Sequence, residues 1–549
     1  MLRLLLFGLA LVACAPGQPF IYYRGVANAA SYVPSGLPNG QIARGSIFSV
    51  FGRAMGPAAG AQVSAFPLGN TLAGVGLDVC QESACVPAIP IYVRQDQINA
   101  IMPSNAPLGA VSLRVTFNGV AGNFTSATVV SQSTGIFTIN SGGFGPAVAQ
   151  NFNSATDQPV NSTTVSAKPG QTIILWATGL GSGLNADSLA PQVGDLPVQL
   201  DIWVGGKQVA TKRYQGRSGC CSGLDQIIFD LPEDTPTGCY VPIQVLAGGT
   251  LISNSATIAV SAEGGSCADP FNPISERFRQ GGKAGLLVAS RSNTLHNYVT
   301  FQPEVTTEAV TATFRTLPGG PFYFDPQISL PPVGSCTVHT ARGDLFGGDD
   351  LLGFLAPASE LNAGPEIRVG GVAVPRDEVK RFYAGQISSE QAGVDPPSRI
   401  FTSPFAVSGP GGADVGAFQF TLQPPGPITF TNRADLEVAN RTKDLVVSWQ
   451  GTDEQRDVIL VTGVGVNLPE NSSAQFICTA SPSSSSFTIP SRILRALPSL
   501  RERPSAEDAF SYVFVGRMPL RAPTAISVSG ADAGFALATQ WAGKAVVIQ

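Results

Sequence analysis

The sequence predicts an all-β protein: tandem immunoglobulin-like β-sandwich domains followed by further β-rich sandwich domains. Three observations support this prediction. Short runs of β-branched and aromatic residues recur between clusters of Gly, Pro and Asn. The segments between these runs lack the long 3.6-residue periodicity of helices. A stretch of the first half of the chain also recurs once, which indicates a duplicated module.

Length and composition limit the kind of protein. A chain of 549 residues is too long for one core and predicts about three to five domains. Charged residues make up 13% of the chain, against roughly 25% in an average soluble protein. A hydrophobic content of 44% argues against disorder, so 61 Gly and 43 Pro indicate a turn-rich fold. With a net charge of only −5, no nucleic-acid partner is expected.

Residues 1–20 are predicted to be an export signal. The apolar run Leu4–Val12 has a suitable length for a signal and is too short to span a bilayer. Leu11-Val12-Ala13-Cys14 resembles a bacterial lipobox, in which Cys14 becomes lipid-modified. Ordinary cleavage after Ala15 or a little later is the alternative, and both stay open. The mature chain is therefore expected outside the cell or on the outer cell surface, with Cys14 as its one candidate membrane anchor.

The other cysteines are even in number, as expected for disulfides in an oxidising compartment. They are Cys80, Cys85, Cys220, Cys221, Cys239, Cys267, Cys336 and Cys478. Cys80 and Cys85 are close enough in sequence to crosslink a hairpin or loop. The four cysteines between Cys220 and Cys267 fall in one region and are expected to pair among themselves. Cys336 and Cys478 are then paired with each other or free. A metal site is disfavoured because no Cys-x-x-Cys occurs.

The repeat defines the first two domains, at residues 21–134 and 135–265. The block Gly45–Gly56 matches Gly170–Gly181 at an offset of 125 residues. Later matches, such as Gln97-Ile98 with Gln226-Ile227, have an offset of 129 residues, so a small insertion separates the copies. Each unit has the size of an immunoglobulin-like sandwich.

The matched segments have the composition of strands bounded by turns. They include Ser46–Phe51, Thr172–Trp176, Leu113–Phe117 and Ala256–Val260, with a hairpin signal at Asn118-Gly119. Trp176 and Trp203 are expected to pack in the core rather than to stack on a ligand.

The second half stays β-rich and is divided into residues 266–410 and 411–549. Ser261–Cys267 has the composition of a linker, and the Gly-Pro-rich stretch Ser408–Ala413 is the best candidate boundary. Short helical pieces are expected at Arg376–Phe382 and Ser491–Leu497.

Several blocks of the first half, in order, resemble a known domain family. They include Gly25–Tyr32, Gly45–Gly56, Gln97–Pro103, Gly135–Thr138 and the blocks from Ala147 to Gly181. Over about residues 22–261 the chain resembles the Solibacter-type family of uncharacterised domains from secreted acidobacterial proteins. The resemblance implies a bacterial origin, export and tandem immunoglobulin-like sandwiches. The family has no assigned activity, so the resemblance implies no site residue.

The sequence contains no recognised catalytic constellation, and no enzymatic activity or catalytic residue is expected. The G-x-S-x-G, H-E-x-x-H, P-loop and dinucleotide motifs are missing. The two histidines, His296 and His339, are interpreted as structural. A glycosidase needs only two carboxylates, so an enzyme with an unrecognised carboxylate pair stays as an alternative.

One acidic, glycine-rich cluster is a candidate Ca²⁺ site. Asp344, Asp349 and Asp350 lie among glycines, where oxygen ligands on a loop suit this ion. A solvated turn is the alternative interpretation, and no other cofactor is expected.

The main functional hypothesis is a non-catalytic scaffold or adhesion-type protein, whose partner is an unknown protein or polysaccharide at the cell surface. A carbohydrate-binding accessory protein is the alternative, because a sandwich face with exposed aromatic rings can stack on sugars. The aromatic residues that decide this are Tyr22, Tyr23, Tyr32, Trp203, Trp449 and Trp541.

Overall fold

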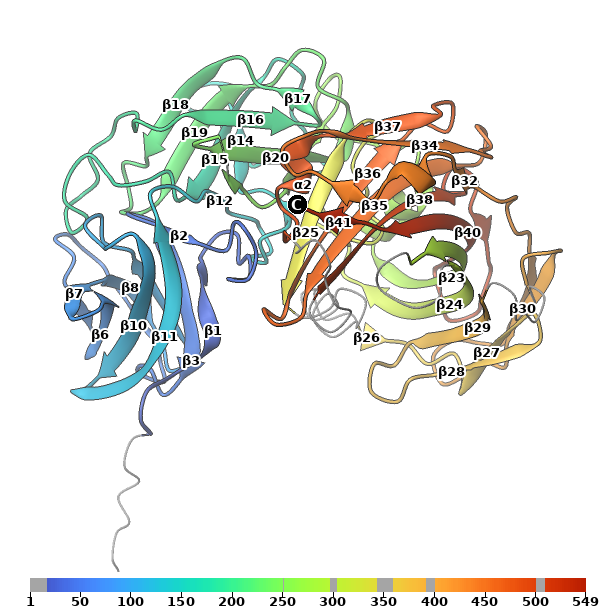
Figure 1. Cartoon of the computed structure of the whole chain (residues 1–549), viewed down its shortest axis with the longest axis horizontal. Helices are drawn as coiled ribbons and strands as arrows, with labels where there is room; N and C mark the ends of the chain where they lie inside the picture. Colours follow the sequence, from blue (N-terminus) through green and yellow to red (C-terminus); the bar gives the residue numbers. More distant parts are fainter. Residues whose placement is uncertain (1–16, 250, 297–303, 343–358, 392–399, 500–508) are drawn as a thin grey trace, which may run out of the picture.

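The computed structural model of the chain describes residues 17–249, 251–296, 304–342, 359–391, 400–499 and 509–549 (Figure 1). It confirms the predicted all-β class, because regular structure in these residues is almost entirely strand. The helices described are short: α1 (Pro273–Arg279), α2 (Ser491–Leu494) and the 3₁₀ turn η1 (Arg433–Asp435). None of the described helices is long and apolar enough to cross a membrane.

The first module is a sandwich of two sheets around one core. The first sheet has the order β1 (Phe20–Asn28), β3 (Ile47–Arg53), β9 (Gln97–Ile101), β8 (Ile89–Val93), β4 (Ala61–Gln62). The second has the order β2 (Ile42–Ala43), β11 (Val120–Val130), β10 (Gly109–Phe117), β6 (Val75–Gln81), β5 (Thr71–Leu72), with β7 (Ala84–Pro87) beside β6. Phe48, Ile98 and Leu113 are among the buried side chains between the sheets.

The second module is also a two-sheet sandwich with its own core. One sheet has the order β12 (Gly135–Ile136), β15 (Thr172–Thr178), β19 (Asp225–Asp230), β18 (Lys212–Arg217), with β14 (Ala149–Asn151) on β15. The other has the order β13 (Gly145–Pro146), β22 (Ala256–Val260), β20 (Gly238–Ala247), β16 (Leu200–Val204), β17 (Lys207–Gln208), with β21 (Leu251–Ile252) on β20. Ile173, Phe229 and Ile243 are buried between them.

The sequence repeat corresponds to a structural repeat. The order β1-β3-β9-β8 in the first module has its counterpart in β14-β15-β19-β18 in the second, and β11-β10-β6 has its counterpart in β22-β20-β16. One hairpin differs in length between the copies. The β8–β9 turn consists of Gln95 and Asp96, closed by the bond from Arg94 N to Gln97 O, whereas the β18–β19 turn spans residues 219–223. An insertion between the copies therefore lies in the β18–β19 turn.

The rest of the chain is built on one long sheet. Its order is β25 (Cys336–Arg342), β36 (Ser472–Ala480), β35 (Val458–Asn467), β38 (Ala509–Met518), β40 (Ala533–Ala545), β23 (Gly282–Leu295), β24 (Glu304–Leu317), β26 (Ser359–Glu360), with β29 (Tyr383–Gln391) on β24 and β39 (Thr524–Ala525) on β40. We call this sheet, with the elements that cover it, the C-terminal body.

The predicted boundary between residues 266–410 and 411–549 is wrong as a division into separate sandwiches. β23 runs parallel to β40 over twelve residue pairs, from Ala284 opposite Ala533 to Leu295 opposite Lys544. β25 pairs with β36 in the same sheet. The stretch 408–413 lies instead at the turn between two strands of one small sheet. Its glycines and proline serve a turn rather than a linker.

Small sheets cover the long sheet at its two ends. One has the order β28 (Val372–Pro375), β27 (Glu366–Val369), β30 (Phe405–Gly409), β31 (Phe418–Leu422) and packs on β23 and β24. The other has the order β32 (Thr429–Phe430), β34 (Leu445–Gln450), β37 (Ser486–Ile489). A two-stranded pair, β33 (Val438–Ala439) with β41 (Val547–Ile548), lies nearby.

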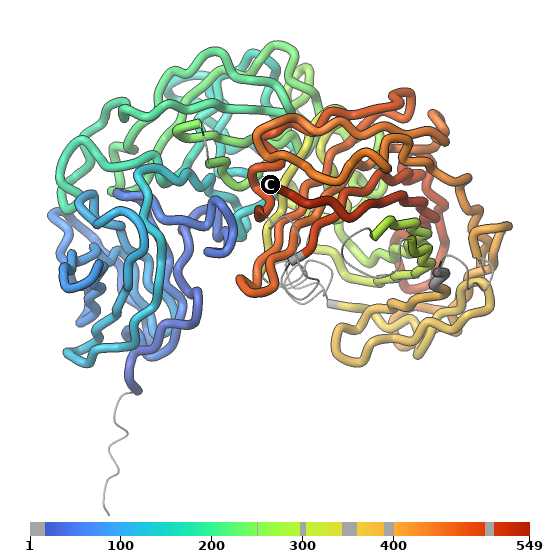
Figure 2. Tube along the Cα trace, in the orientation of Figure 1, coloured from blue at the N-terminus to red at the C-terminus, as the bar shows by residue number. Residues whose placement is uncertain are grey.

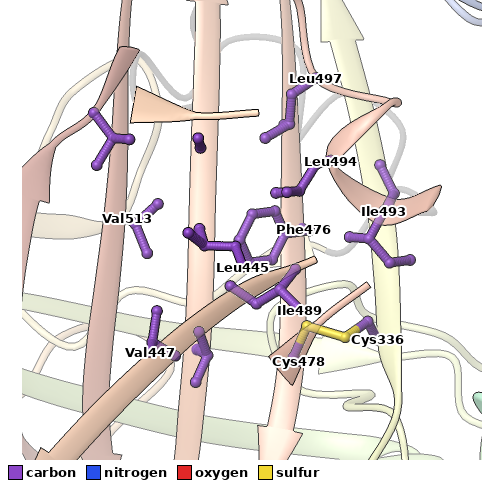
Figure 3. Close-up of a cluster of buried hydrophobic side chains, with 14 of the residues drawn as sticks. Cys336, Leu445, Val447, Phe476, Cys478, Ile489, Ile493, Leu494, Leu497 and Val513 are labelled. Carbon is purple, nitrogen blue, oxygen red and sulfur yellow. A yellow bond between two sulfur atoms is a disulfide. The ribbon is translucent and has the colours of Figure 1, made fainter. Parts of the chain in front are cut away.

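Figure 3 shows the core beneath β34, β37 and α2. Phe476 of the long sheet lies among Leu445, Ile489 and Leu494, beside the Cys336–Cys478 disulfide. Trp449 is also fully buried here, so it is a core residue. Successive residues of β35 point to opposite faces, and α1 packs on the face opposite to α2.

Of the two predicted helical pieces, only one forms. Ser491–Leu494 is helical, and turns follow it. Residues 376–382 form a turn, because Asp377 Oδ1 accepts bonds from the backbone of Val379 and Lys380, and Arg381 has a positive φ of 62°.

The two modules and the C-terminal body contact one another. In Figure 2 the blue first module and the orange C-terminal strands both lie against the green second module. Val33 and Leu37 of the first module, and Leu246 and Ile252 of the second, belong to the same buried cluster as Phe476. Gln244 Nε2 also donates to Cys336 O on the edge strand β25.

The shared sheet makes a testable prediction about fragments. Residues 266–410, expressed alone, lack β40 beside β23 and β36 beside β25, so their central strands have unpaired edges. We expect this fragment to show no cooperative thermal unfolding by circular dichroism, whereas residues 266–549 unfold cooperatively. A cooperative transition in the 266–410 fragment would contradict the shared-sheet architecture.

Candidate binding site

Two predicted sites lie outside the described residues: the candidate lipidation site Cys14 and the candidate Ca²⁺ ligands Asp344, Asp349 and Asp350. Both stay predictions. Within the described part of the chain, no group of three or more His, Cys, Asp or Glu side chains is arranged to hold a metal ion.

The eight remaining cysteines form four disulfides. Cys80–Cys85 joins β6 to β7 across a hairpin, as expected from their spacing. The four cysteines of the middle region pair among themselves, as Cys220–Cys221 and Cys239–Cys267. Cys336 pairs with Cys478, which is one of the two alternatives that the sequence leaves open.

The two histidines have structural surroundings. His296 Nδ1 lies 3.0 Å from the hydroxyl of Tyr512, and partial burial lowers the pKa of this imidazole. His339 is buried on β25, where its ring packs against those of Phe144 and Phe324, and neither ring nitrogen has a hydrogen-bond partner in the described structure. Burial lowers the pKa of His339 to about 4, so its ring is neutral at pH 7.

The aromatic residues singled out above divide into exposed and covered ones. Tyr22 and Tyr23 on β1 are 47% and 75% exposed. Tyr32 and Trp541 are half-buried. Trp203 is half-buried under the guanidinium of Arg492, 3.9 Å from the ring centroid, and burial lowers the pKa of that guanidinium to about 10. Trp176 is half-buried and donates from Nε1 to Gln150.

A cavity of about 470 Å³ lies between the first two modules, which is within the usual size range of ligand sites. We call it the inter-module pocket. The first module contributes Ile47, Gln62, Val63, Ser64, Ala65, Phe66, Leu68, Ile91, Tyr92 and Asn99, and the second contributes Cys220, Cys221 and Ser222. None of these side chains is charged. The pocket therefore combines apolar surfaces with neutral amide and hydroxyl groups.

The second module reaches the pocket through the turn at residues 219–223. Ser218 N bonds to Leu224 O at the base of this turn, and Ser222 Oγ donates to Leu189 O. The disulfide between the adjacent residues Cys220 and Cys221 closes a small ring within the turn, and both residues are exposed. The backbone of the turn is thus fixed at both its base and its tip.

A buried ion pair lies at the base of the same turn. Arg217 and Asp225 are 4% and 0% exposed, and Arg217 Nη1 donates to the Asp225 carboxylate. Arg217 Nη2 donates to Gly181 O in its own module and, at 2.8 Å, to Gly45 O in the first module. A guanidinium suits such a site because its donors are fixed in one plane. Through its bond to Gly45, Arg217 links the two modules directly.

Further bonds hold the modules together around the pocket. Ile47 N donates to Thr178 Oγ1 at 2.9 Å, and Leu68 N donates to Ser188 O at 2.7 Å. The backbone and hydroxyl of Ser104 both donate to Asp187, each at 2.8 Å. Because these contacts come from several strands and loops, the pocket walls are held in fixed positions.

This pocket could not be predicted from the sequence. Its lining residues come from two modules and from loops separated by more than a hundred residues, so no local motif marks them. The one local signal is the adjacent pair Cys220-Cys221, which the sequence alone indicates only as part of a disulfide set.

No family model and no curated protein sequence matches the chain. Among solved structures, the chain is similar to a Bacteroides ovatus mixed-linkage glucan utilization locus protein, SGBP-B, in complex with a mixed-linkage heptasaccharide. The sequence identity is 9%, the match covers 83% of this chain and 89% of that chain, and the TM-score is 0.14. It is also similar to domains 5–6 of the S-layer protein SbsC, at 11% identity, with 44% of this chain and 98% of that chain covered and a TM-score of 0.17. A third similarity is to a tetra-tandem repeat from the extending region of a large adhesion protein, at 10% identity, with 95% of this chain and 98% of that chain covered and a TM-score of 0.13.

The buried pair predicts a large difference between two arginine variants. Arg217→Met leaves Asp225 as an unpaired buried charge, so we expect the free energy of unfolding to fall by about 3–5 kcal/mol. Arg213 lies on the same strand as Arg217 and forms a more exposed pair with Asp230, so Arg213→Met serves as the control. We expect a much smaller loss of unfolding free energy in this variant. Guanidinium unfolding followed by tryptophan fluorescence measures both. Equal losses would show that the Arg217 pair does not fasten the modules.

The buried imidazole of His339 predicts a pH dependence of stability. Its folded pKa of about 4 lies below the ordinary value of 6.5, so between these values only the unfolded chain takes up the proton. Wild-type stability therefore falls as the pH falls from 6.5 towards 4, by up to roughly 3 kcal/mol.

The variants His339→Phe and His339→Leu should lose this slope, as measured by urea unfolding at several pH values. Glu360 titrates in the same range with the opposite sign, because burial raises the pKa of its carboxyl to about 7. The difference between wild type and variant isolates the contribution of His339. A difference that does not change with pH would refute the assignment.

Proposed function

We propose that this chain is a non-catalytic, exported protein that acts as a scaffold or adhesion-type module at the cell surface. The observation that supports this most is the fastening of its modules. The bond from Arg217 to Gly45 and a core shared by all three parts make one continuous β-rich body, and four disulfides crosslink strands and loops of that body. Such a body suits a load-bearing or ligand-presenting role in an oxidising environment.

Carbohydrate binding is the second candidate function. It is favoured by the exposed rings of Tyr22 and Tyr23, which are among the aromatic residues that decide this question. The guanidinium carbon of Arg24 lies 4.8 Å from the Tyr23 ring centroid and packs against one face of that ring. The Tyr22 and Tyr23 rings offer an apolar surface on which a sugar ring can stack.

An enzyme with an unrecognised carboxylate pair has less support. Four cavities lined by described residues hold at most one carboxylate each, Asp269 in one and Glu366 in another. Asp269 is bonded to Arg279, and Glu366 to Arg368. Two facing carboxylates, as glycoside hydrolysis requires, are not brought together in these cavities.

Membership of the Solibacter-type family and lipidation at Cys14 remain part of the proposal. Both rest on the sequence, through the ordered blocks of residues 22–261 and the segment Leu11–Cys14. They agree with an exported protein whose cysteines are oxidised.

Export makes a direct prediction about the full chain expressed in a bacterium. We expect the mature protein outside the cytoplasm, with its N-terminus at Cys14 or beyond and all eight other cysteines resistant to alkylation without reductant. Intact-protein mass spectrometry after iodoacetamide treatment measures both. A chain lacking residues 1–20 is the control and should stay in the cytoplasm. Full-length chain with intact signal and free thiols in the cytoplasm would overturn the proposal.

A further inference from the structure

We propose that the inter-module pocket is a binding site for a neutral saccharide, in which the Cys220–Cys221 disulfide supplies part of the apolar surface. This inference rests on the proposed extracellular role and deepens the second candidate function. It also places the binding site at the junction of the modules rather than on the exposed rings of β1.

The lining of the pocket selects a neutral ligand. Its thirteen residues include no Asp, Glu, Lys, Arg or His. Hydrogen bonds between a charged ligand group and an oppositely charged side chain are the strong ones, and this lining offers none of them to a phosphate, a carboxylate or an ammonium group. A ligand that fits here must therefore be held by neutral hydrogen bonds and by apolar contact.

The polar groups match the hydroxyls of a sugar. Asn99 Oδ1 accepts bonds from Ser49 Oγ at 2.9 Å and from Gln97 Nε2 at 3.0 Å, which fixes the amide in one orientation. No acceptor is present for Asn99 Nδ2 in the described structure. The hydroxyl of Tyr92 and the amide of Gln62 also line the pocket. Amides and hydroxyls both donate and accept, as do the hydroxyls of a sugar.

The apolar groups match the C–H face of a sugar ring. Phe66, Ile91 and the ring of Tyr92 come from the first module, and the sulfur atoms of Cys220 and Cys221 come from the second. Sulfur is polarizable and makes favourable contacts with apolar groups. The small ring closed by two adjacent cysteines adds little flexibility. A mixed lining of this kind suits a ligand with one apolar face and a polar rim.

The position of the pocket allows entry and preorganisation. Gln62, Phe66 and Cys220 are exposed, so a segment of a longer polysaccharide can enter from solvent. The turn at residues 219–223 is anchored at its base by the Arg217–Asp225 pair. A site whose walls are fixed before binding loses less entropy when a ligand binds.

The test uses the full exported chain with its disulfides oxidised. Isothermal titration calorimetry measures binding of cellohexaose, maltohexaose, laminarihexaose, xylohexaose and N-acetylglucosamine hexaose, with hexagalacturonate as the charged comparison. We expect at least one neutral oligosaccharide to bind and the charged one not to bind. Asn99→Ala removes a fixed donor and should weaken binding by about tenfold.

Matched variants locate the site. The double variant Cys220→Ser/Cys221→Ser should weaken binding by about tenfold or more, whereas Cys80→Ser/Cys85→Ser, which removes a disulfide outside the pocket, should not change it. Tyr23→Ala tests the competing site on the exposed rings of β1. Thermal unfolding of each variant shows that it is folded, and Gln62→Ala, on an exposed residue, replaces any variant that does not fold.

Three outcomes would overturn the inference. Binding that is lost in Tyr23→Ala and kept in the pocket variants would place the site on β1. This result would support carbohydrate binding and contradict its location in the inter-module pocket. If an exported, folded chain binds no neutral oligosaccharide, the proposed role of the pocket is contradicted, whereas the scaffold proposal is unaffected. Preferred binding of hexagalacturonate would contradict the neutral ligand.

Discussion

The junction of the first two modules depends on the buried guanidinium of Arg217. Its charge is met by Asp225, and its remaining donors reach Gly181 in its own module and Gly45 in the other. A buried charge without such partners destabilises a fold strongly, so this arrangement favours one relative position of the modules. Arg217 ends β18 and Asp225 begins β19, and the turn between them carries the adjacent cysteines. The contact that fixes the modules therefore also fixes one wall of the pocket.

The C-terminal body depends on a different constraint, the pairing of strands far apart in the sequence. β23 lies parallel to β40 although more than two hundred residues separate them. β25 pairs with β36, where Cys336 and Cys478 form a disulfide at a sequence separation of 142 residues. Closing such loops costs chain entropy before the sheet gains its contacts. The edge strand β25 then docks on the second module, where Val338 N donates to Ser255 Oγ and Gln244 donates to Cys336 O. A single sheet thereby connects the end of the chain to the repeated modules.

Local features of the fold could be predicted from sequence, and long-range ones could not. The runs Ser46–Phe51 and Thr172–Trp176 correspond to β3 and β15, because strand composition and turn residues act over a few positions. The parallel pairing of β23 with β40 leaves no local trace. The sequence predicts a boundary at the Gly-Pro stretch of residues 408–413, because a turn within a sheet and a linker between domains share the same composition. The pocket was missed for a similar reason, since its two walls come from different modules.

The pocket lies where the two copies of the repeat have diverged. In the first module the β8–β9 hairpin closes with the short turn at Gln95 and Asp96, whereas the equivalent β18–β19 hairpin carries residues 219–223. These additional residues include Cys220, Cys221 and Ser222, which all face the pocket. The opposite wall uses β8 and β9, the same hairpin of the other copy. Duplication thus supplied two similar surfaces, and a longer turn on one of them created a cavity that neither module contains alone.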